Sequence, residues 1–178
     1  MDALIDILMA LSYITFWGSR FLRTKKGMLI GHSVGIGLFR IPSFALDGNI
    51  NGIENSILIV VRNITIQCID KKKRKIKVLF FVLYVVVSWT LYFIAYAGVQ
   101  TWFVACSGTA TTLCFVFGKE QIMRIGGIVG ASLYACFQFF SGQYVGFVLE
   151  MVTCVANLCS FVFYRIKNKG GKRVAEKV

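Results

Sequence analysis

Long apolar runs, separated by short polar turns, follow one another along the whole chain. Seven of them can be marked, at residues 3–20, 28–46, 50–69, 76–95, 99–117, 122–140 and 143–165. Each has about 18 to 23 residues, and about 20 helical residues are needed to cross the ~30 Å hydrocarbon layer of a bilayer. Lipid offers the backbone no hydrogen-bond partners, so a helix is the natural spanning form. The pattern predicts an all-α membrane protein with seven transmembrane helices.

The composition agrees with a chain that lies almost wholly in a membrane. Of the 178 residues 57% are hydrophobic, 16% are charged and one is proline, and the mean hydropathy is +0.70. Soluble domains are nearer to about 45–50% apolar, so we expect one embedded domain without a separate soluble core. The N-terminal stretch MDALID is acidic, whereas a signal peptide begins with basic residues, so we expect the first run to be retained.

Basic residues distinguish the two ends of the predicted helices. Of the 20 Lys and Arg, 18 fall at alternate helix ends, within residues 20–26, 71–77, 118–124 and 165–177. Cytoplasmic loops are enriched in Lys and Arg, so we expect the N-terminus outside the cell and the C-terminus in the cytoplasm. The net charge of +12 is typical of a surface that attracts anionic lipid headgroups. No aromatic stacking pattern accompanies the basic residues, so a nucleic-acid partner is not expected.

Two parts of the sequence repeat at a nearly constant distance. The stretch IGHSVG at 30–35 recurs as IGGIVG at 125–130, 95 residues later. At a spacing of 94 residues, three more positions match: Gly48 with Gly142, Gly52 with Gly146, and Asn63 with Asn157. The repeat predicts two three-helix bundles of the same orientation, because a single linker helix between them keeps their directions equal.

The repeat divides the chain into four parts. We expect a first bundle at 1–70, a basic loop with the linker helix at 71–97, a second bundle at 98–166, and a basic cytoplasmic tail at 167–178. Two parallel copies are related by a pseudo-two-fold axis along the membrane normal, and transporters built in this way bind their substrates where the copies meet.

This order of three, one and three helices resembles the SWEET sugar transporters and their relatives, which include the nicotinamide riboside carriers, the PQ-loop proteins and the KDEL receptor. SWEETs have an Asn in the third helix of each bundle, facing the substrate site. Asn63 and Asn157 stand at those positions here. SWEETs also hinge at prolines in four helices, whereas this chain has only Pro42 and no PQ dipeptide. The resemblance therefore implies an axial site, and the missing prolines are a departure from the SWEET-type hinge.

A closer resemblance is to the bacterial inner-membrane YgjV family. It rests on residues 117–170, where Glu150 precedes Asn157 by seven residues and a basic stretch follows, and on Arg62 before a basic loop. The resemblance implies a multi-pass protein of the bacterial inner membrane. That family has no established activity to carry over.

Polar residues inside the apolar runs are the candidates for a binding site. A charged or strongly polar side chain at membrane depth is costly and normally faces a partner or a wet cavity. Glu150 and Asn157 lie seven residues apart and share a helix face, as do Ser56 and Asn63 in the first copy. Two facing carboxamides can hold a small polar solute from opposite sides. The alternative is that each Asn hydrogen-bonds a neighbouring helix and only stabilises the bundle.

The charged residues leave further alternatives open. Glu150 can carry a proton or bind a solute, or it can form a structural ion pair with Arg40, for which Glu54 competes. Arg62 can extend its long stem toward the headgroups, or it can face inward and bind an acidic group of a solute. Consecutive helical residues point about 100° apart, so Arg62 and Asn63 need not share one cavity.

Other positions give less specific signals. Gln138 and Tyr13 can line the same cavity or hydrogen-bond a helix, and His32, the sole histidine, is expected to pack at the membrane interface. The Gly-x-x-x-Gly spacings of the repeat allow helices to approach closely, within a bundle or between copies of the chain. A homo-oligomer is therefore among the partners that the sequence allows.

Enzymatic chemistry has little support. One histidine gives no metal-binding cluster, and no Gly-rich phosphate loop or nucleophile motif is present. The six cysteines lack C-x-x-C spacing and lie in apolar runs, which is typical of reduced, packed thiols. We therefore expect no catalytic residue, metal or cofactor. The sequence favours a carrier or facilitator for a small polar solute, and the alternative is a membrane-embedded binding or accessory protein without transport activity.

Overall fold

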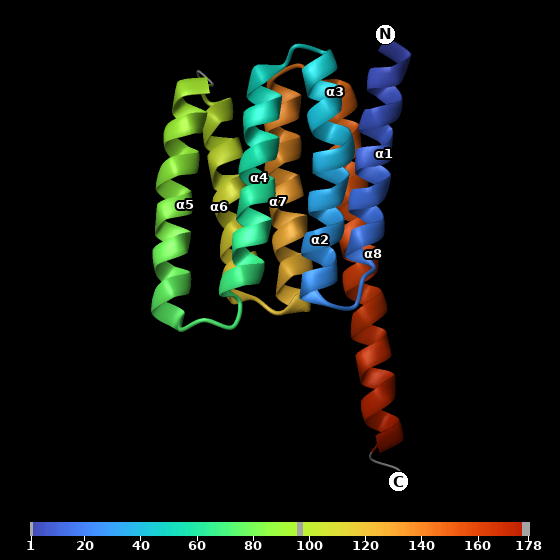
Figure 1. Cartoon of the computed structure of the whole chain (residues 1–178). Helices are drawn as coiled ribbons and strands as arrows, with labels where there is room; N and C mark the ends of the chain where they lie inside the picture. The colour runs from blue at the N-terminus through green and yellow to red at the C-terminus, as the bar shows by residue number, and fades with distance from the viewer. Residues whose placement is uncertain (1, 96–97, 176–178) are drawn as a thin grey trace.

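The chain folds into long helices that run up and down beside one another (Figure 1). The computed structural model describes residues 2–95 and 98–175. In this part of the chain the elements are α1 (Asp2–Arg20), α2 (Lys25–Gly35), the π-helical segment η1 (Ile36–Arg40), α3 (Ile41–Leu46), α4 (Ile50–Ile69), α5 (Arg74–Ala95), α6 (Gln100–Phe117), α7 (Glu120–Phe140) and α8 (Tyr144–Ala175). Since α2, η1 and α3 follow one another without a break, the described residues contain seven long helices, and the all-helical prediction is confirmed.

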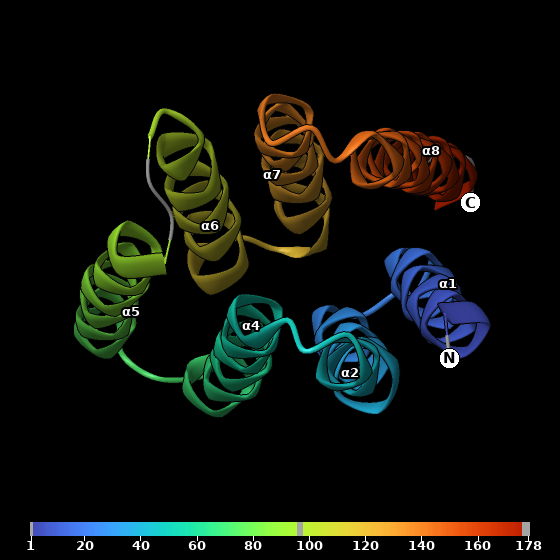
Figure 2. The same cartoon turned by 90° about the horizontal axis from the view of Figure 1, so that it is seen from above.

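Seen along the helix axes, the helices form a closed ring (Figure 2). Consecutive helices lie next to each other around it, and α8 closes the ring against α1. The ring does not separate by itself into two bundles and a linker helix. The predicted grouping of three, one and three helices is therefore not confirmed by the arrangement alone.

The second helix of the ring is continuous but changes its winding in the middle. Pro42 lies in the first turn of α3 and has no backbone N–H to donate. Directly before it, the N–H of Ile41 bonds the carbonyl of Ile36, five residues earlier, which is the π-helical pattern. The wider turn accommodates the proline inside the helix. The polar residues that interrupt this apolar run therefore do not mark a break.

The ring has an apolar outer surface and a polar interior. Large hydrophobic side chains are exposed on several helices, among them Ile50, Ile94, Val145 and Val155. Arginine, asparagine and glutamate side chains are buried instead, which reverses the usual distribution in soluble proteins. Among the described residues, four helical segments are long and apolar enough to cross a membrane by length and composition: Lys25–Leu46, Arg74–Ile94, Glu120–Phe140 and Tyr144–Lys167. A membrane location is therefore plausible.

The basic stretches of the sequence gather at one end of the ring. The turns at 21–24, 70–73 and 118–119 lie at the lower end in Figure 1, and the C-terminal part of α8 extends below them. The N-terminus lies at the opposite end. The prediction that the basic stretches share one side is confirmed. The tail predicted from residue 167 onward continues α8 as far as Ala175.

Two turns at the less basic end have the same backbone conformation. Gly48 and Gly142, which the repeat makes equivalent, have φ angles of 69° and 72°. This left-handed region is readily accessible only to glycine. In both turns the residue after the glycine donates its N–H to the carbonyl five residues earlier at 2.9 Å, a bond that ends a helix in the Schellman motif. The repeated sequence thus adopts a repeated structure.

The repeated glycines of α2 and α7 also have equivalent neighbours. Each packs on the helix that precedes its own, at positions that are again 95 residues apart. The contacts are Gly31 with Ser19 and Gly126 with Cys114, then Gly35 with Ser12 and Gly130 with Ser107. Helix α2 therefore packs on α1 as α7 packs on α6, and the glycines provide the close approach that their spacing predicts.

Candidate functional site

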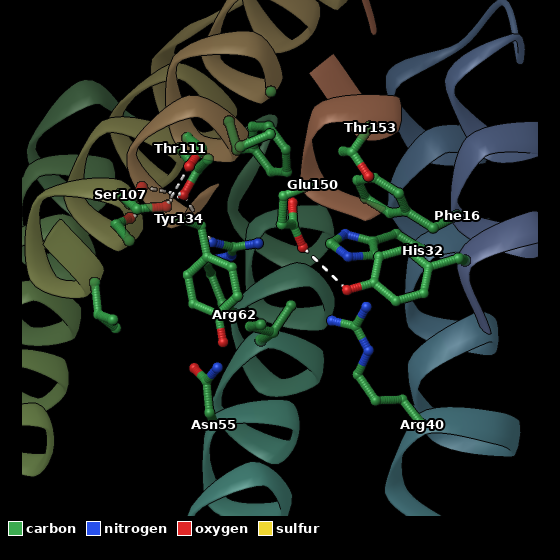
Figure 3. A pocket seen from close by; sticks show the side chains of 18 of the residues that line it. Phe16, His32, Arg40, Asn55, Arg62, Ser107, Thr111, Tyr134, Glu150 and Thr153 are labelled. Carbon is green, nitrogen blue, oxygen red and sulfur yellow. Dashed lines mark hydrogen bonds between the residues drawn. The ribbon is translucent and has the colours of Figure 1, made fainter. Parts of the chain in front are cut away.

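A polar cavity lies inside the ring (Figure 3). It has a volume of about 110 Å³. An engineered cavity of roughly 150 Å³ holds benzene, so this one fits a ligand of only a few non-hydrogen atoms or several waters. The charged residues in its wall are Arg20, Arg40, Arg62 and Glu150. Hydroxyl groups and aromatic rings from both halves of the chain complete the wall.

Equivalent positions of the two sequence copies line this one cavity. The pairs are Tyr13 with Gly108, Phe16 with Thr111, Arg20 with Phe115, His32 with Gly127, and Ile59 with Thr153. The cavity therefore lies where the two copies meet. The charges do not follow the repeat, because the counterpart of Arg20 is a phenylalanine and the counterpart of Glu150 is Ser56. A symmetric frame thus surrounds an asymmetric set of charged groups.

Arg62 extends into the ring. Only 4% of the residue is exposed. Its Nε and Nη2 donate to Oδ1 of Asn63, both at 3.3 Å, and its Nη1 donates to the hydroxyls of Thr111 and Thr112 at 3.3 and 3.4 Å. These contacts join α4 to α6, and all of them are to neutral groups. The structure therefore favours the inward-facing alternative over an extension toward the headgroups.

Asn63 connects Arg62 to the histidine. Because its Oδ1 accepts from Arg62, its Nδ2 faces Nδ1 of His32 at 3.3 Å. An amide nitrogen only donates, so Nδ1 must accept, which places the proton on Nε2 and leaves the ring neutral. His32 is 8% exposed, lines the cavity, and lies with its ring centroid 4.5 Å from that of Phe16. The expectation that His32 packs at the membrane interface is wrong.

Asn157 is as deeply buried as Asn63, but its surroundings differ. Its Nδ2 donates to the carbonyl of Thr153, one turn earlier on α8, at 2.9 Å. Its Oδ1 has no hydrogen-bond partner among the described residues. That oxygen lies over Gly127, where a methyl group would be 2.5 Å away. Gly127 is the counterpart of His32, so the side chain that bonds Asn63 is missing in the second copy.

The two carboxamides do not meet on a solute in this structure. Asn63 and Asn157 are both fully buried and lie outside the described wall of the cavity. Asn63 bonds Arg62 and His32, and Asn157 bonds its own helix. Their contacts correspond to the alternative in which each Asn stabilises its surroundings.

Glu150 and Arg40 meet through a tyrosine. Glu150 is 7% exposed, and its Oε1 accepts a hydrogen bond from the hydroxyl of Tyr13 at 3.2 Å. The Arg40 guanidinium lies over the same ring, with Cζ 4.7 Å from its centroid. In the view of Figure 3, Glu150 lies between Arg62 on one side and Arg40 on the other. Within the described ranges, the ion pairs closer than 4 Å both involve Asp70. The alternative of a direct Glu150–Arg40 ion pair is therefore not observed, and the two residues are connected through Tyr13 instead.

Arg20 lines the cavity, although in the sequence it is indistinguishable from the other basic residues at its helix end. The residue is only 2% exposed. Its Cζ lies 4.3 Å from the ring centroid of Phe16 and 5.3 Å from that of Phe115. Its Nε and Nη1 are buried and have no hydrogen-bond partner among the described residues. With respect to the residues that the structure describes, Arg20 therefore has two unsatisfied donors inside the ring.

Two further candidates are buried without entering the described cavity wall. Ser56 is 1% exposed and Gln138 is 7% exposed. Asn55, next to Ser56, lines the cavity instead and accepts a hydrogen bond from Tyr92 at 3.0 Å. Gln138 packs against Gly146 at the start of α8. Of these two neighbours on α4, it is therefore Asn55 and not Ser56 that lines the cavity.

A second group of charges, the Asp70 cluster, lies at the basic end and consists of Lys25, Asp70 and Lys77. Lys25 Nζ lies 2.6 Å from Oδ1 of Asp70 and donates to the carbonyl of Gly118 at 3.3 Å, and Lys77 Nζ lies 3.7 Å from Asp70. Partial burial disfavours the ionised carboxyl, but the hydrogen bond and charge of Lys25, with Lys77, outweigh it and lower the pKa of Asp70. The cluster links α2, α4 and α5 to the turn after α6.

Comparison of the chain with family models, curated proteins and solved structures gives no match. The resemblance to the YgjV family and to SWEET-like proteins therefore stays a prediction. Among the described residues, no group of three or more His, Cys, Asp or Glu is placed to hold a metal ion. What the site offers chemically is a small cavity with fixed guanidinium groups, one carboxyl group and several hydroxyls.

Proposed function

We propose that this chain is a membrane carrier or facilitator for a small polar solute, and that the solute binds in the ring cavity. The observation that carries the proposal is the charged cavity at the meeting of two repeated units, inside a ring with an apolar outer surface. Ionisable groups at membrane depth are costly and commonly mark solute pathways. Parallel-repeat transporters place their substrate site where the repeats meet.

We also infer that the ring consists of two three-helix units joined by α5. The matching turns at Gly48 and Gly142 and the equivalent glycine contacts of α2 and α7 support this division. The location that we propose is the bacterial inner membrane, with the N-terminus outside. The gathering of basic turns at the opposite end supports this orientation.

The residues have separate roles in the proposal. Arg62 and the Tyr13–Glu150 pair supply polar groups to the solute, because they line the cavity directly. Asn63 and His32 position Arg62 through the hydrogen bonds described above. Asn157 is assigned to the packing of α8 against α7, since its side chain contacts Gly127.

Two observations favour the alternative of a binding or accessory protein. Arg62 holds α4 to α6 through neutral hydrogen bonds, and the chain has only one proline at which a helix can hinge. A carrier must expose its site alternately to both sides, and such ties resist that motion. A protein that only binds its solute needs access from one side.

Access to the cavity distinguishes these functions without knowledge of the solute. Ala131 lines the cavity and is 7% exposed, whereas Val155 is 57% exposed on the outer surface of the ring. In a background without the six native cysteines, we expect Ala131→Cys to react with a small charged thiol reagent added from either side. Val155→Cys, which faces lipid, should stay unreactive. Reaction from one side only supports the binding or accessory protein, and no reaction from either side contradicts a solute site.

A further inference from the structure

The wall of the cavity carries more positive than negative charge. The wall contains three guanidinium groups, those of Arg20, Arg40 and Arg62, and one carboxyl group, that of Glu150. His32 adds no charge, because its Nδ1 accepts a hydrogen bond from Asn63. Even with Glu150 ionised, the net charge of the wall is +2. A buried charge without a partner is strongly unfavourable, so this excess requires a counter-charge.

The excess is concentrated at one part of the cavity. Arg40 is balanced by Glu150 through the ring and hydroxyl of Tyr13. The charges of Arg20 and Arg62 remain unbalanced. Both residues lie against Phe115, with their Cζ atoms 5.3 and 5.1 Å from its ring centroid. Both arginines also line the same cavity, so the excess positive charge is concentrated beside Phe115.

The same two arginines have donors to offer. Nε and Nη1 of Arg20 are buried without a hydrogen-bond partner in the described part of the chain. Arg62 is held in place by neutral acceptors only, so its hydrogen bonds position the guanidinium without neutralising it. A planar guanidinium offers parallel N–H donors that match the oxygens of a carboxylate or phosphate.

We propose that the cavity binds a small oxyanion, a short carboxylate or inorganic phosphate or sulfate, held between Arg20 and Arg62. The inference rests on the proposed solute site and names its substrate class. The volume of about 110 Å³ limits the anion to roughly the size of benzene or smaller. Glu150 faces the same space from the Arg40 side, so it repels the anion and sets an upper limit on how tightly the anion binds.

The test uses the full chain in discs of phosphatidylcholine, which carries no net charge. Thermal unfolding is followed with sodium phosphate, sulfate or acetate, and with sodium chloride at equal ionic strength as the reference. Acetamide and methylammonium, which are small enough for the cavity, serve as neutral and cationic probes. A ligand raises the unfolding temperature only if it binds the native state better than the unfolded one. We expect at least one oxyanion to raise it above the chloride reference, and the other two probes to leave it unchanged.

Three variants locate the anion. Arg20→Gln should weaken binding of that oxyanion by about tenfold or more, because a charge-assisted bond is lost. Arg23→Gln removes the same charge from an exposed residue outside the cavity and should leave the affinity within about twofold, as expected for a screened surface charge. Glu150→Gln removes the repelling carboxylate and should tighten binding by about threefold or more. The opposite sign at Glu150 separates an anion site from a site for a cation.

Anionic lipid provides a second source of the same oxyanion chemistry. Discs that contain phosphatidylglycerol should leave the effect of free phosphate intact if the site takes a soluble anion. If phosphatidylglycerol alone raises the unfolding temperature, and Arg20→Gln removes that rise, the oxyanion is a lipid headgroup. Both results support an oxyanion site and differ only in its source.

Other outcomes overturn the inference. If no oxyanion exceeds the chloride reference while acetamide or methylammonium does, the anion class is wrong and the proposed solute site stands. A loss of affinity in Glu150→Gln, or an unchanged affinity in Arg20→Gln, also contradicts the inference. If none of the probes has an effect and the cavity cysteine is unreactive, the solute site itself is wrong.

Discussion

Arg62 donates two hydrogen bonds, through Nε and Nη2, to the carboxamide oxygen of Asn63, the residue that directly follows it on α4. Adjacent helical residues point about 100° apart, so the long stem of the arginine must bend back toward its neighbour. Nη1 then reaches the hydroxyls on α6, and Nδ2 of Asn63 is left to bond His32. The asparagine therefore positions the arginine, which explains why a buried arginine carries an amide beside it.

The first prediction compares the two repeated asparagines. Asn63→Ala leaves donors of Arg62 and the Nδ1 of His32 without their partner. Asn157→Ala removes one bond to a carbonyl of its own helix and an oxygen that has no partner. A buried group that loses its partner costs about 1–3 kcal/mol. We expect Asn63→Ala to lower the free energy of unfolding by about that much more than Asn157→Ala does.

Unfolding in detergent by chemical denaturant measures this difference. The two variants delete the same atoms at fully buried positions, so each serves as the control for the other. Equal losses would mean that the hydrogen bonds to Arg62 and His32 contribute nothing beyond packing.

The second prediction concerns the shape of the Arg62 side chain. Arg62→Lys keeps the charge but replaces a planar fork with a point charge that cannot reach α6 and Asn63 together. We expect the free energy of unfolding to fall by about 1–3 kcal/mol, since buried acceptors lose their donors. Arg23→Lys, at an exposed position, is the matched control and should change little. A fully stable Arg62→Lys protein would instead indicate that Arg62 needs only its charge, as a residue that extends to the headgroups does.

The third prediction tests the contact between Asn157 and α7. In Gly127→Ala the new methyl group would lie 2.5 Å from Oδ1 of Asn157, so either the buried Asn157 side chain or the two helices must shift. We expect a loss of about 1–3 kcal/mol, the usual cost of overpacking. Gly18→Ala on α1 is the control, because nothing lies within 4 Å of its added methyl group. There the substitution should be neutral or stabilising, since alanine is the better helix former. A Gly127→Ala protein as stable as Gly18→Ala would show that the contact is not tight.

The sequence predicted the helices well because membrane helices follow from two strong signals. Length and hydropathy set each helix, and the observed bounds differ from the predicted ones by a few residues, apart from α8. The repeat was readable because its glycines are required by geometry: Gly48 and Gly142 need a positive φ, and Gly31 and Gly126 allow close packing. Such positions tolerate few other residues.

The site was harder to predict because side-chain direction is decided by neighbours in space. The sequence placed Asn63 and Asn157 symmetrically, but His32 and its counterpart Gly127 give the two amides different partners. Arg20 is the last residue of α1 and is continuous with a basic stretch. Only the ring of helices shows that its side chain lies inside, against the rings of two phenylalanines.

The fourth prediction concerns the orientation of the chain in the membrane. Asn49 lies in the turn between α3 and α4, and Lys73 lies at the basic end, in the turn before α5. In a background without native cysteines, we expect Asn49→Cys to react with an impermeant reagent added outside intact cells. Lys73→Cys should react only after the membrane is opened. Reaction of both from the outside would overturn the topology, and the reverse pattern would invert it.

The last prediction uses pH to test the Asp70 cluster. Lys25 and Lys77 lower the pKa of Asp70 in the folded protein despite partial burial. A carboxyl with a lowered folded pKa contributes stability that is fully present above its unfolded value of about 3.9 and is lost as the pH falls through the folded value. Asp70 is 43% exposed, so screening limits the contribution to about 0.2–1 kcal/mol. We expect Asp70→Asn to be less stable than the natural chain at neutral pH. The difference should shrink as the pH falls below about 4 and disappear once the pH is below the lowered pKa of Asp70 in the folded protein. Asp47→Asn, an exposed change at the opposite end, should show no such convergence. If the stability difference between Asp70→Asn and the natural chain grew as the pH fell, the sign would be opposite to the expected one. The ion pairs of Asp70 would then not be the cause of the difference.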